Sequence, residues 1–272
     1  MTRGYAVLVT EEKIRLGGMA LPNGVLVHGP HSWACAIRHD DGRLEVASAT
    51  KPLQAARIKS PFLRGPARLA EALALLPQVK RRLPAARLPM ENPAVVASMV
   101  GAAVAVKEIR ESDRIRPVAR ELLSGALSIT PALLALRGSG ELTAYHGAEH
   151  ISIGSYEQGV RATKEHDRCG GHLVGPLVAT TTAANLLAGL APERMRKPAR
   201  LAAQLGALAA ATEIFGWMTR NPSHPVAQAL SKPGHELQHR LSTAEPTEEQ
   251  LEVAEAALAA CLELEHVAAR AA

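Results

Sequence analysis

The sequence predicts an α+β protein, in which a small antiparallel β-rich unit is followed by a mostly helical bundle rich in alanine and leucine. Of the 272 residues, 47% are hydrophobic but only 3% are aromatic, so alanine and leucine must supply most of the buried surface. These residues favour helices because their side chains lose little conformational freedom there. Turn signals are instead frequent in the first fifty residues. We expect residues 1–60 and 61–272 to form one integrated domain.

The N-terminal unit is expected to consist of short strands joined by tight turns. Residues 32–38 (SWACAIR) and 43–48 (RLEVAS) flank the tetrapeptide HDDG at residues 39–42. An Asp-Gly step between two such strands is a strong hairpin signal. Residues 5–10 (YAVLVT) form a further short apolar run. Additional turns are indicated by glycines at Gly17, Gly18, Gly24 and Gly29.

Beyond residue 60 the pattern becomes helical, with proline-rich breaks at residues 84–93 and 222–233. The C-terminal helix has the clearest start signal, the sequence TEEQ at residues 247–250. This is a capping box, in which the first and fourth side chains each bond the backbone amide of the other residue. It predicts a helix over the following LEVAEAALAACLELE segment.

Four apolar runs could form either buried helices or membrane spans. Residues 170–192 contain no Asp, Glu, Lys or Arg and are long enough to cross a bilayer. Residues 201–218 would be a second span but include Glu213, and residues 92–106 and 122–136 are closer to the length of buried helices. Because all four runs depend on Ala, Gly and Thr, membrane insertion would be weakly driven. Composition alone therefore favours buried helices of a cytoplasmic protein.

Charge and cysteine content argue against several classes of protein. The net charge is +5, and no aromatic residues are interleaved with the basic clusters at residues 80–82 and 194–200, so we do not expect nucleic-acid binding. Cys35, Cys169 and Cys261 lie far apart and form no CxxC pair, which argues against a disulfide framework or a zinc ribbon. The expected partner is a small-molecule or peptide substrate, with a membrane as a further candidate.

The most specific motif is HGAEH at residues 146–150, which fits the pattern HxxEH, the inverse of the zinc-protease motif HExxH. On a helix, His146 and His150 would lie one turn apart and differ by about 40° in direction, so both could bind one metal ion. Glu149 could take a proton from a water molecule that the metal activates. The alternative is a polar helix face whose histidines are satisfied by hydrogen bonds.

A metal ion would need at least one further ligand. Glu157 falls on the same helix face, but an unbroken helix would place it about 16 Å along the axis from His146, too far for one ion. The segment HDRC at residues 166–169 could fold back onto the helix and present His166, Cys169 or both. Glu157 would then support the ligands or serve another site. The alternatives are a buried thiol for Cys169 and an ordinary polar residue for His166.

Glu213 is an acid within an apolar run. If its helix is buried or in lipid, an ionised carboxylate needs a partner. Arg168 or the metal itself could fill that role, which would make Glu213 part of the site. The alternative is an exposed position on an amphipathic helix.

These motifs together resemble the YqhQ-like family, a domain of unknown function (DUF1385) whose members are labelled as predicted metal-dependent enzymes. The central similarity lies in residues 145–150, 156–159 and 166–170. The resemblance implies a β-rich unit followed by hydrophobic helices that cross a membrane, with the histidine motif between two helix pairs. It extends over nearly the whole chain, through residues 17–18, 24–25, 29–30, 61–65, 233–234, 238, 245–246 and 250–254.

The chain departs from the family pattern near its N-terminus. Met19, Asn23 and His28 stand where glutamine, glutamate and arginine are usual. Ile151-Ser152 also replaces the usual lysine-threonine pair after the histidine motif. Because Asn23 lacks a carboxylate, the departure argues against acid–base chemistry or metal binding by its loop.

Motif and resemblance lead to the hypothesis of a zinc-dependent hydrolase of unknown substrate. His146 and His150 would bind the metal, His166 or Cys169 would complete the site, and Glu149 would be the general base. Nitrogen and thiolate ligands suit zinc better than magnesium or calcium.

Two alternatives remain at this stage. One is a non-catalytic, membrane-associated assembly or interaction protein with a closed structural site of four ligands. The other is a transporter-like membrane protein in which Glu213 and the histidines line a polar path. Three protein ligands with an open position would indicate catalysis, whereas four would indicate a structural site.

Overall fold

The computed structural model describes residues 13–112, 114–137 and 140–271, and its strands and helices confirm the α+β class. The apolar run at residues 5–10 lies outside the described residues. The strands are β1 (Gly17–Leu21), β2 (Gly24–His28), β3 (Ser32–Arg38) and β4 (Leu44–Thr50). The helices are α1 (Pro61–Arg82), α2 (Pro93–Glu111), α3 (Pro117–Arg137), α4 (Gly140–Gln158), α5 (Val174–Gly189), α6 (Glu193–Arg220), α7 (Pro225–Leu237) and α8 (Glu248–Ala271).

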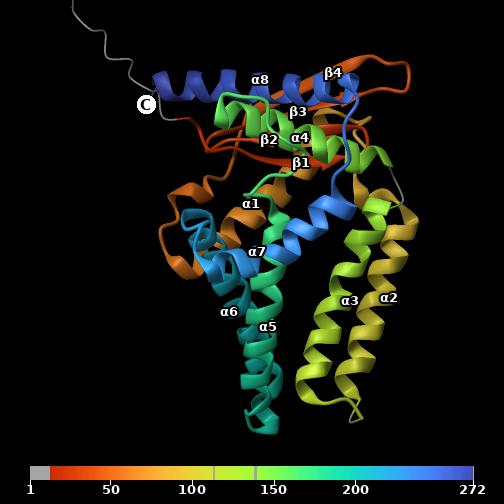
Figure 1. Ribbon diagram of the computed structural model, residues 1–272, viewed down its shortest axis with the longest axis vertical. Coiled ribbons are helices and arrows are strands. Elements are labelled where there is room, and N and C mark those ends of the chain that lie inside the picture. Colours follow the sequence, from red (N-terminus) through yellow and green to blue (C-terminus); the bar gives the residue numbers. More distant parts are fainter. Residues whose placement is uncertain (1–12, 113, 138–139, 272) are drawn as a thin grey trace, which may run out of the picture.

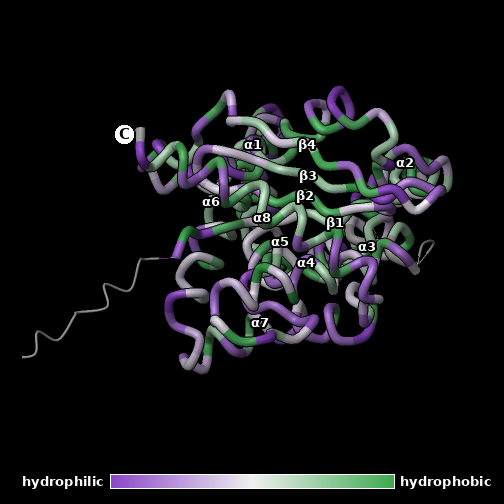
Figure 2. The backbone as a smooth tube through the Cα atoms, turned by 90° about the horizontal axis from the view of Figure 1, so that it is seen from above, coloured by the Kyte–Doolittle hydropathy of each residue, from purple (hydrophilic) through white to green (hydrophobic). Residues whose placement is uncertain are grey.

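The four strands form one antiparallel sheet in the order β1-β2-β3-β4, and Figure 2 shows them side by side from above. The predicted hairpin between β3 and β4 is confirmed, with Arg38 paired to Leu44 across the turn. Gly42 has a φ of +84°, a left-handed conformation that glycine adopts without steric cost. The Asp41 carboxylate accepts a hydrogen bond of 3.0 Å from the Arg43 amide, so the turn is held by its own side chain.

Helices cover both faces of the sheet, which gives the globular part of the molecule three layers (Figure 1). Successive side chains of a strand point to opposite faces, and both faces here are apolar. One face packs against α4 and α8 through Val25, Val27, Ala34 and Ala36. The other packs against α1 and the residues that follow it through Leu21, Leu26, Trp33, Cys35 and Ile37.

Helix α8 begins at the predicted capping box. The Gln250 amide donates to the Thr247 hydroxyl at 3.3 Å, and the Thr247 amide donates to the Gln250 side chain at 3.0 Å. The helix then crosses the sheet and ends near the turn between β2 and β3. There the Glu265 carboxylate accepts hydrogen bonds from the backbone amides of His31 and Ser32, at 2.8 and 2.6 Å, and from the Ser32 hydroxyl.

The four apolar runs form α2, α3, α5 and α6, which pair as two helical hairpins, α2–α3 and α5–α6. Both hairpins extend away from the sheet and α8 (Figure 1), and they contact each other through α3 and α5. Many of their large apolar side chains are exposed, among them Val100, Val104, Leu187, Leu201 and Leu205. Within the described residues, one helix, Glu193–Arg220, is long and apolar enough to cross a membrane.

The partner of Glu213 differs from the one that the sequence suggested. Its carboxylate forms a bidentate pair with Arg64 of α1, with Nε 2.6 Å from Oε1. Arg168 instead pairs with Glu157. Close packing at Gly65, where a Cβ atom would lie 1.9 Å from the Thr212 hydroxyl, brings α1 and α6 near enough for the Arg64 pair. Glu213 therefore fixes the α5–α6 hairpin to α1.

We predict that Glu265→Gln lowers the free energy of unfolding at pH 7 by about 2 kcal/mol, because hydrogen bonds to a buried carboxylate lose their charge and one acceptor. Although burial acts in the opposite direction, the hydrogen bonds from Ser32 and His31 hold the pKa of Glu265 below its usual value. The contribution of the ionised Glu265 carboxylate to the free energy of unfolding is therefore complete above the unfolded-state pKa of about 4.3. This stabilisation is lost as the pH falls below that value.

Thermal unfolding followed by circular dichroism at pH 7 and pH 4 would measure this effect. The matched control is Glu263→Gln, an exposed position on the same helix, which should unfold like the wild type. Equal stabilities of the Glu265→Gln variant and the wild type at pH 7 would contradict the role assigned to Glu265.

Candidate metal centre

Helix α4 carries the histidine motif through the interior of the protein, between β1, β2 and α8. His146 and His150 lie one turn apart, as predicted, with ring centroids separated by 4.3 Å. Gly147 between them allows another segment to approach, because a Cβ atom there would lie 2.1 Å from the Ala244 carbonyl oxygen. This close contact brings the chain around residue 242 to the ring of His146.

Both histidines are held by backbone carbonyls in the same way. The Nδ1 atom of His146 lies 2.8 Å from the Ser242 oxygen, and that of His150 lies 2.7 Å from the Lys164 oxygen. Because a carbonyl only accepts, each Nδ1 must carry the hydrogen, which leaves the lone pair of each ring on Nε2. This arrangement is typical of histidines that bind metals through Nε2.

Both imidazoles are neutral near pH 7. Burial lowers the pKa of His146. Burial, and then the neighbouring His146, lower the pKa of His150 to about 3. Neutral imidazole is the form that binds a metal ion.

The segment at residues 166–169 folds back onto α4 and brings Cys169 to the histidines. The Cys169 sulfur lies 3.6 Å from His146 Nε2, and one donor atom from each of His146, His150 and Cys169 lies within 4.8 Å of the others. Tetrahedral zinc ligands at about 2.0–2.3 Å from the ion lie about 3.5 Å from each other, which is close to the 3.6 Å between the Cys169 sulfur and His146 Nε2. Burial raises the pKa of the Cys169 thiol to about 12, and a bound cation would favour its thiolate form.

His166 lies beside these three residues but is not part of the donor group, and its Nε2 faces Glu157. Its ring centroid is 5.6 Å from that of His150, while its Nε2 is 3.2 Å from a Glu157 oxygen. The other Glu157 oxygen pairs with Arg168. Glu157 thus orients His166 and Arg168. Among the described residues, the potential metal-binding group consists of His146, His150 and Cys169.

Glu149 is almost fully buried, with 7% of its surface exposed, and its carboxylate lies against β1. A Cβ atom at Gly18 would be 2.3 Å from a Glu149 oxygen, so only glycine leaves room for this side chain. Within the described part of the chain, no hydrogen bond to the carboxylate is found. Burial raises the pKa of Glu149 to about 7, against the opposing effect of His166, so the group can both accept and release a proton near neutral pH.

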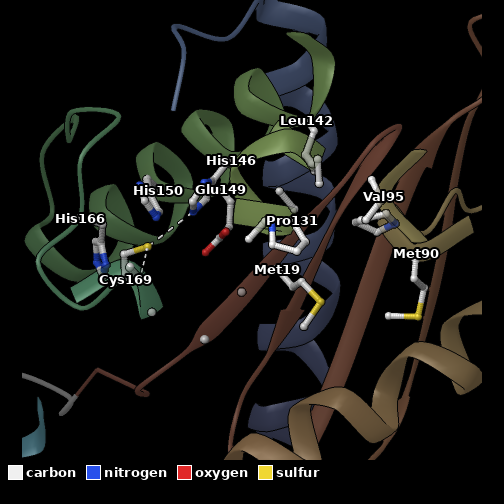
Figure 3. A pocket seen from close by; sticks show the side chains of 18 of the residues that line it. Met19, Met90, Val95, Pro131, Leu142, His146, Glu149, His150, His166 and Cys169 are labelled. Carbon is white, nitrogen blue, oxygen red and sulfur yellow. Dashed lines mark hydrogen bonds between the residues drawn. The ribbon is translucent and has the colours of Figure 1, made fainter. Parts of the chain in front are cut away.

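A cavity of about 880 Å³ begins at this cluster and extends to the base of the α2–α3 hairpin. Figure 3 shows the polar residues at one end, with Met19, Met90, Val95, Pro131 and Leu142 at the other. The size is typical of sites for small organic ligands.

Sequence reasoning missed the residues that shape the site around the motif. The Ser242 and Lys164 carbonyls carry no side-chain signal, because any residue can supply a backbone oxygen. Gly18 could have been recognised from the sequence, because it belongs to a glycine pair that matches the family pattern. Asn23 bonds the backbone of Arg38, Ala85 and Arg87, so its structural role is to join the β1–β2 turn to the chain after α1.

Comparison with known families supports the resemblance seen in the motifs. Residues 140–264 match the family described as "Protein of unknown function (DUF1385)". This match supports the assignment of the chain as a DUF1385 family member. It spans α4 to most of α8, so it includes His146, Glu149, His150 and Cys169 but not the strands or the α2–α3 hairpin. No curated protein and no solved structure matches the chain.

We predict that His146→Ala weakens zinc binding by more than about 100-fold, because loss of a ligand exceeds the 10–100-fold cost of losing a supporting residue. His166→Ala should weaken it less, because its Nε2 faces Glu157. Zinc content by mass spectrometry, with competition against a chelator, would measure both affinities.

The control is His239→Ala, at a largely exposed histidine, which should bind zinc like the wild type. A larger loss from His166→Ala than from His146→Ala would show that the three-residue assignment is incorrect.

Proposed function

We propose that this protein is a zinc-dependent hydrolase, with His146, His150 and Cys169 as metal ligands and Glu149 as general base. The proposal rests on one arrangement of side chains. Three potential metal ligands, His146, His150 and Cys169, border a cavity. The buried carboxylate of Glu149, which has no hydrogen-bond partner in the described chain, lies beside them. The combination of ligands, base and room for a substrate is what metal-assisted hydrolysis requires.

The protein groups have distinct tasks in this proposal. His146 and His150 present Nε2 because their Nδ1–H groups are held by carbonyls, and the Gly171 amide supports the Cys169 sulfur at 3.4 Å. Zinc, when bound, polarises water or a substrate oxygen and lowers the pKa of water. The Glu149 carboxylate would take the proton of the attacking water and deliver it to the leaving group. The absence of a side chain at Gly18 leaves room for that carboxylate.

The number of donors favours catalysis over a structural metal site. A structural zinc is closed by four protein ligands, whereas a catalytic zinc has three and keeps one position for water or substrate. His166, the natural fourth ligand, is turned to Glu157. Glu213, which the transporter hypothesis requires beside the histidines, pairs with Arg64 and is not among the residues that line the cavity.

We also propose that the two hairpins place the enzyme in a membrane. Large apolar side chains are exposed along them, and charged residues gather at their far ends, at residues 107–111, 114–116 and 193–200. This distribution would leave apolar helix surface between a polar tip and the polar globular part, as expected for membrane-embedded hairpins.

The membrane proposal predicts that the protein stays in the membrane pellet after alkaline carbonate extraction. Val100→Lys should increase the extracted fraction, because a lysine at the centre of a membrane helix costs about 3 kcal/mol. Glu263→Lys, on the exposed surface of α8, is the matched control and should behave like the wild type. Complete release of the wild type into the supernatant would exclude stable insertion.

The catalytic proposal predicts that acetohydroxamate, a small metal-binding acid, changes the visible absorption bands of the cobalt-substituted protein. Glu149→Gln should keep its cobalt but bind acetohydroxamate about 10–100-fold more weakly, since a charged hydrogen bond and a proton acceptor are lost. Glu141→Gln, an exposed position on α4, is the control.

Cobalt bands that acetohydroxamate leaves unchanged would show a closed structural site. Loss of cobalt from the Glu149→Gln variant would instead make Glu149 a ligand or a structural support.

A further inference from the structure

We infer that the substrate of this site is a long-chain amphiphile, whose apolar chain occupies the cavity while its polar, reacting group lies at His146, Glu149 and Cys169. This inference rests on the proposed hydrolase function and adds the chemical class of the substrate. It depends on the lining of the cavity, on the position of its mouth, and on the surface around that mouth.

The cavity is polar at one end and apolar over the rest of its length. The reacting end carries the metal-binding group, Glu149, and the paired His166 and Arg168. Beyond it the walls come from β1, α2 and α3 and consist of small apolar residues and methionines, including Met19, Val95, Ala102, Ala103, Pro131 and Ala135. A ligand that fills this space must therefore be polar at one end only.

Among the described residues, the two polar side chains in the remaining lining do not change this conclusion. The Nδ1 atom of His28 accepts a hydrogen bond of 3.1 Å from the Lys51 ammonium group, which also pairs with Glu71 at 2.9 Å. Burial and the charge of Lys51 lower the pKa of His28 to about 4, so it is uncharged. The Ser128 hydroxyl donates to the Ser124 carbonyl of its own helix.

The apolar walls also argue against a peptide substrate. A peptide brings an amide donor and a carbonyl acceptor with every residue, and each would be buried without a partner along these walls. A hydrocarbon chain has no such groups and gains free energy from every methylene that leaves water. Of the two substrate classes that the sequence left open, the apolar lining therefore favours a small molecule over a peptide.

The mouth of the cavity opens onto an apolar surface. Met90 and Met99 both line the cavity and are exposed, at 52% and 53%, so they mark the opening beside α2. The neighbouring exposed residues of the same helix are Val96, Val100 and Val104. An amphiphile held in a bilayer or micelle can enter there without leaving apolar surroundings, whereas a water-soluble substrate would have to cross this rim.

The test uses the cobalt-substituted full-length protein in lipid nanodiscs, so that no free detergent competes for the cavity. The probes are hydroxamates with chains of two, six and ten carbons, and binding is followed by the cobalt absorption bands. We expect affinity to rise with chain length, by up to about fourfold for each methylene that is buried.

Two variants separate binding in the cavity from partition into the lipid. Ala103→Phe adds a ring within the lining of the cavity, whereas Val104→Phe places the same ring at the next residue of α2, which is equally classed as exposed but lies outside the lining. The ten-carbon probe should bind Ala103→Phe at least about tenfold more weakly than Val104→Phe, the equivalent of losing about two buried methylenes. Acetohydroxamate should bind both variants equally.

Each other outcome has a defined meaning. If acetohydroxamate binds but the ten-carbon probe does not distinguish the two variants, the substrate class is wrong while the open metal site stands. If no hydroxamate alters the bands, the proposed function fails as well. Should Ala103→Phe lose its cobalt spectrum, Ala132→Phe on the opposite wall, contributed by α3, provides the same comparison.

Discussion

Two hydrogen bonds from imidazole N–H groups to backbone carbonyls determine what this site can do. They fix His146 and His150 in the tautomer that leaves a lone pair on Nε2, and they hold the two rings beside Cys169. The carbonyls belong to Lys164 and Ser242, which are far from each other in the sequence. The donor group therefore exists only when the loop after α4 and the segment before α8 have both packed against α4, so the site is a consequence of the complete fold.

Burial gives the site its rigidity and its electrostatic character. Helix α4 packs beside α8 on one face of the sheet, and most of residues 142–154 are buried. Desolvation keeps the histidines neutral and raises the pKa of the Glu149 carboxyl, which are the protonation states that ligands and a general base need. The same burial requires glycine wherever another segment approaches, as at Gly18 against Glu149 and Gly147 against Ala244.

Local patterns in the sequence were sufficient to predict local structure. The Asp-Gly turn, the capping box at residues 247–250, the four apolar helices and the one-turn spacing of His146 and His150 depend on neighbours along the chain. Long-range pairing could not be predicted in the same way. Glu213 pairs with Arg64 rather than Arg168, and the His166 ring faces Glu157, because these choices depend on which helices meet. The cavity was also missed, since its walls come from β1, α2, α3 and α4.

Cys169 belongs to two parts of the molecule at once. Its sulfur lies beside His146, and it also accepts a hydrogen bond from Gly171 at the start of the short helix Gly170–Leu173, which continues directly into α5. The residue at which the α5–α6 hairpin is joined to the rest of the chain is thus also a residue that contacts α4. A cation held by Cys169 and the two histidines would therefore tie the start of this hairpin to α4.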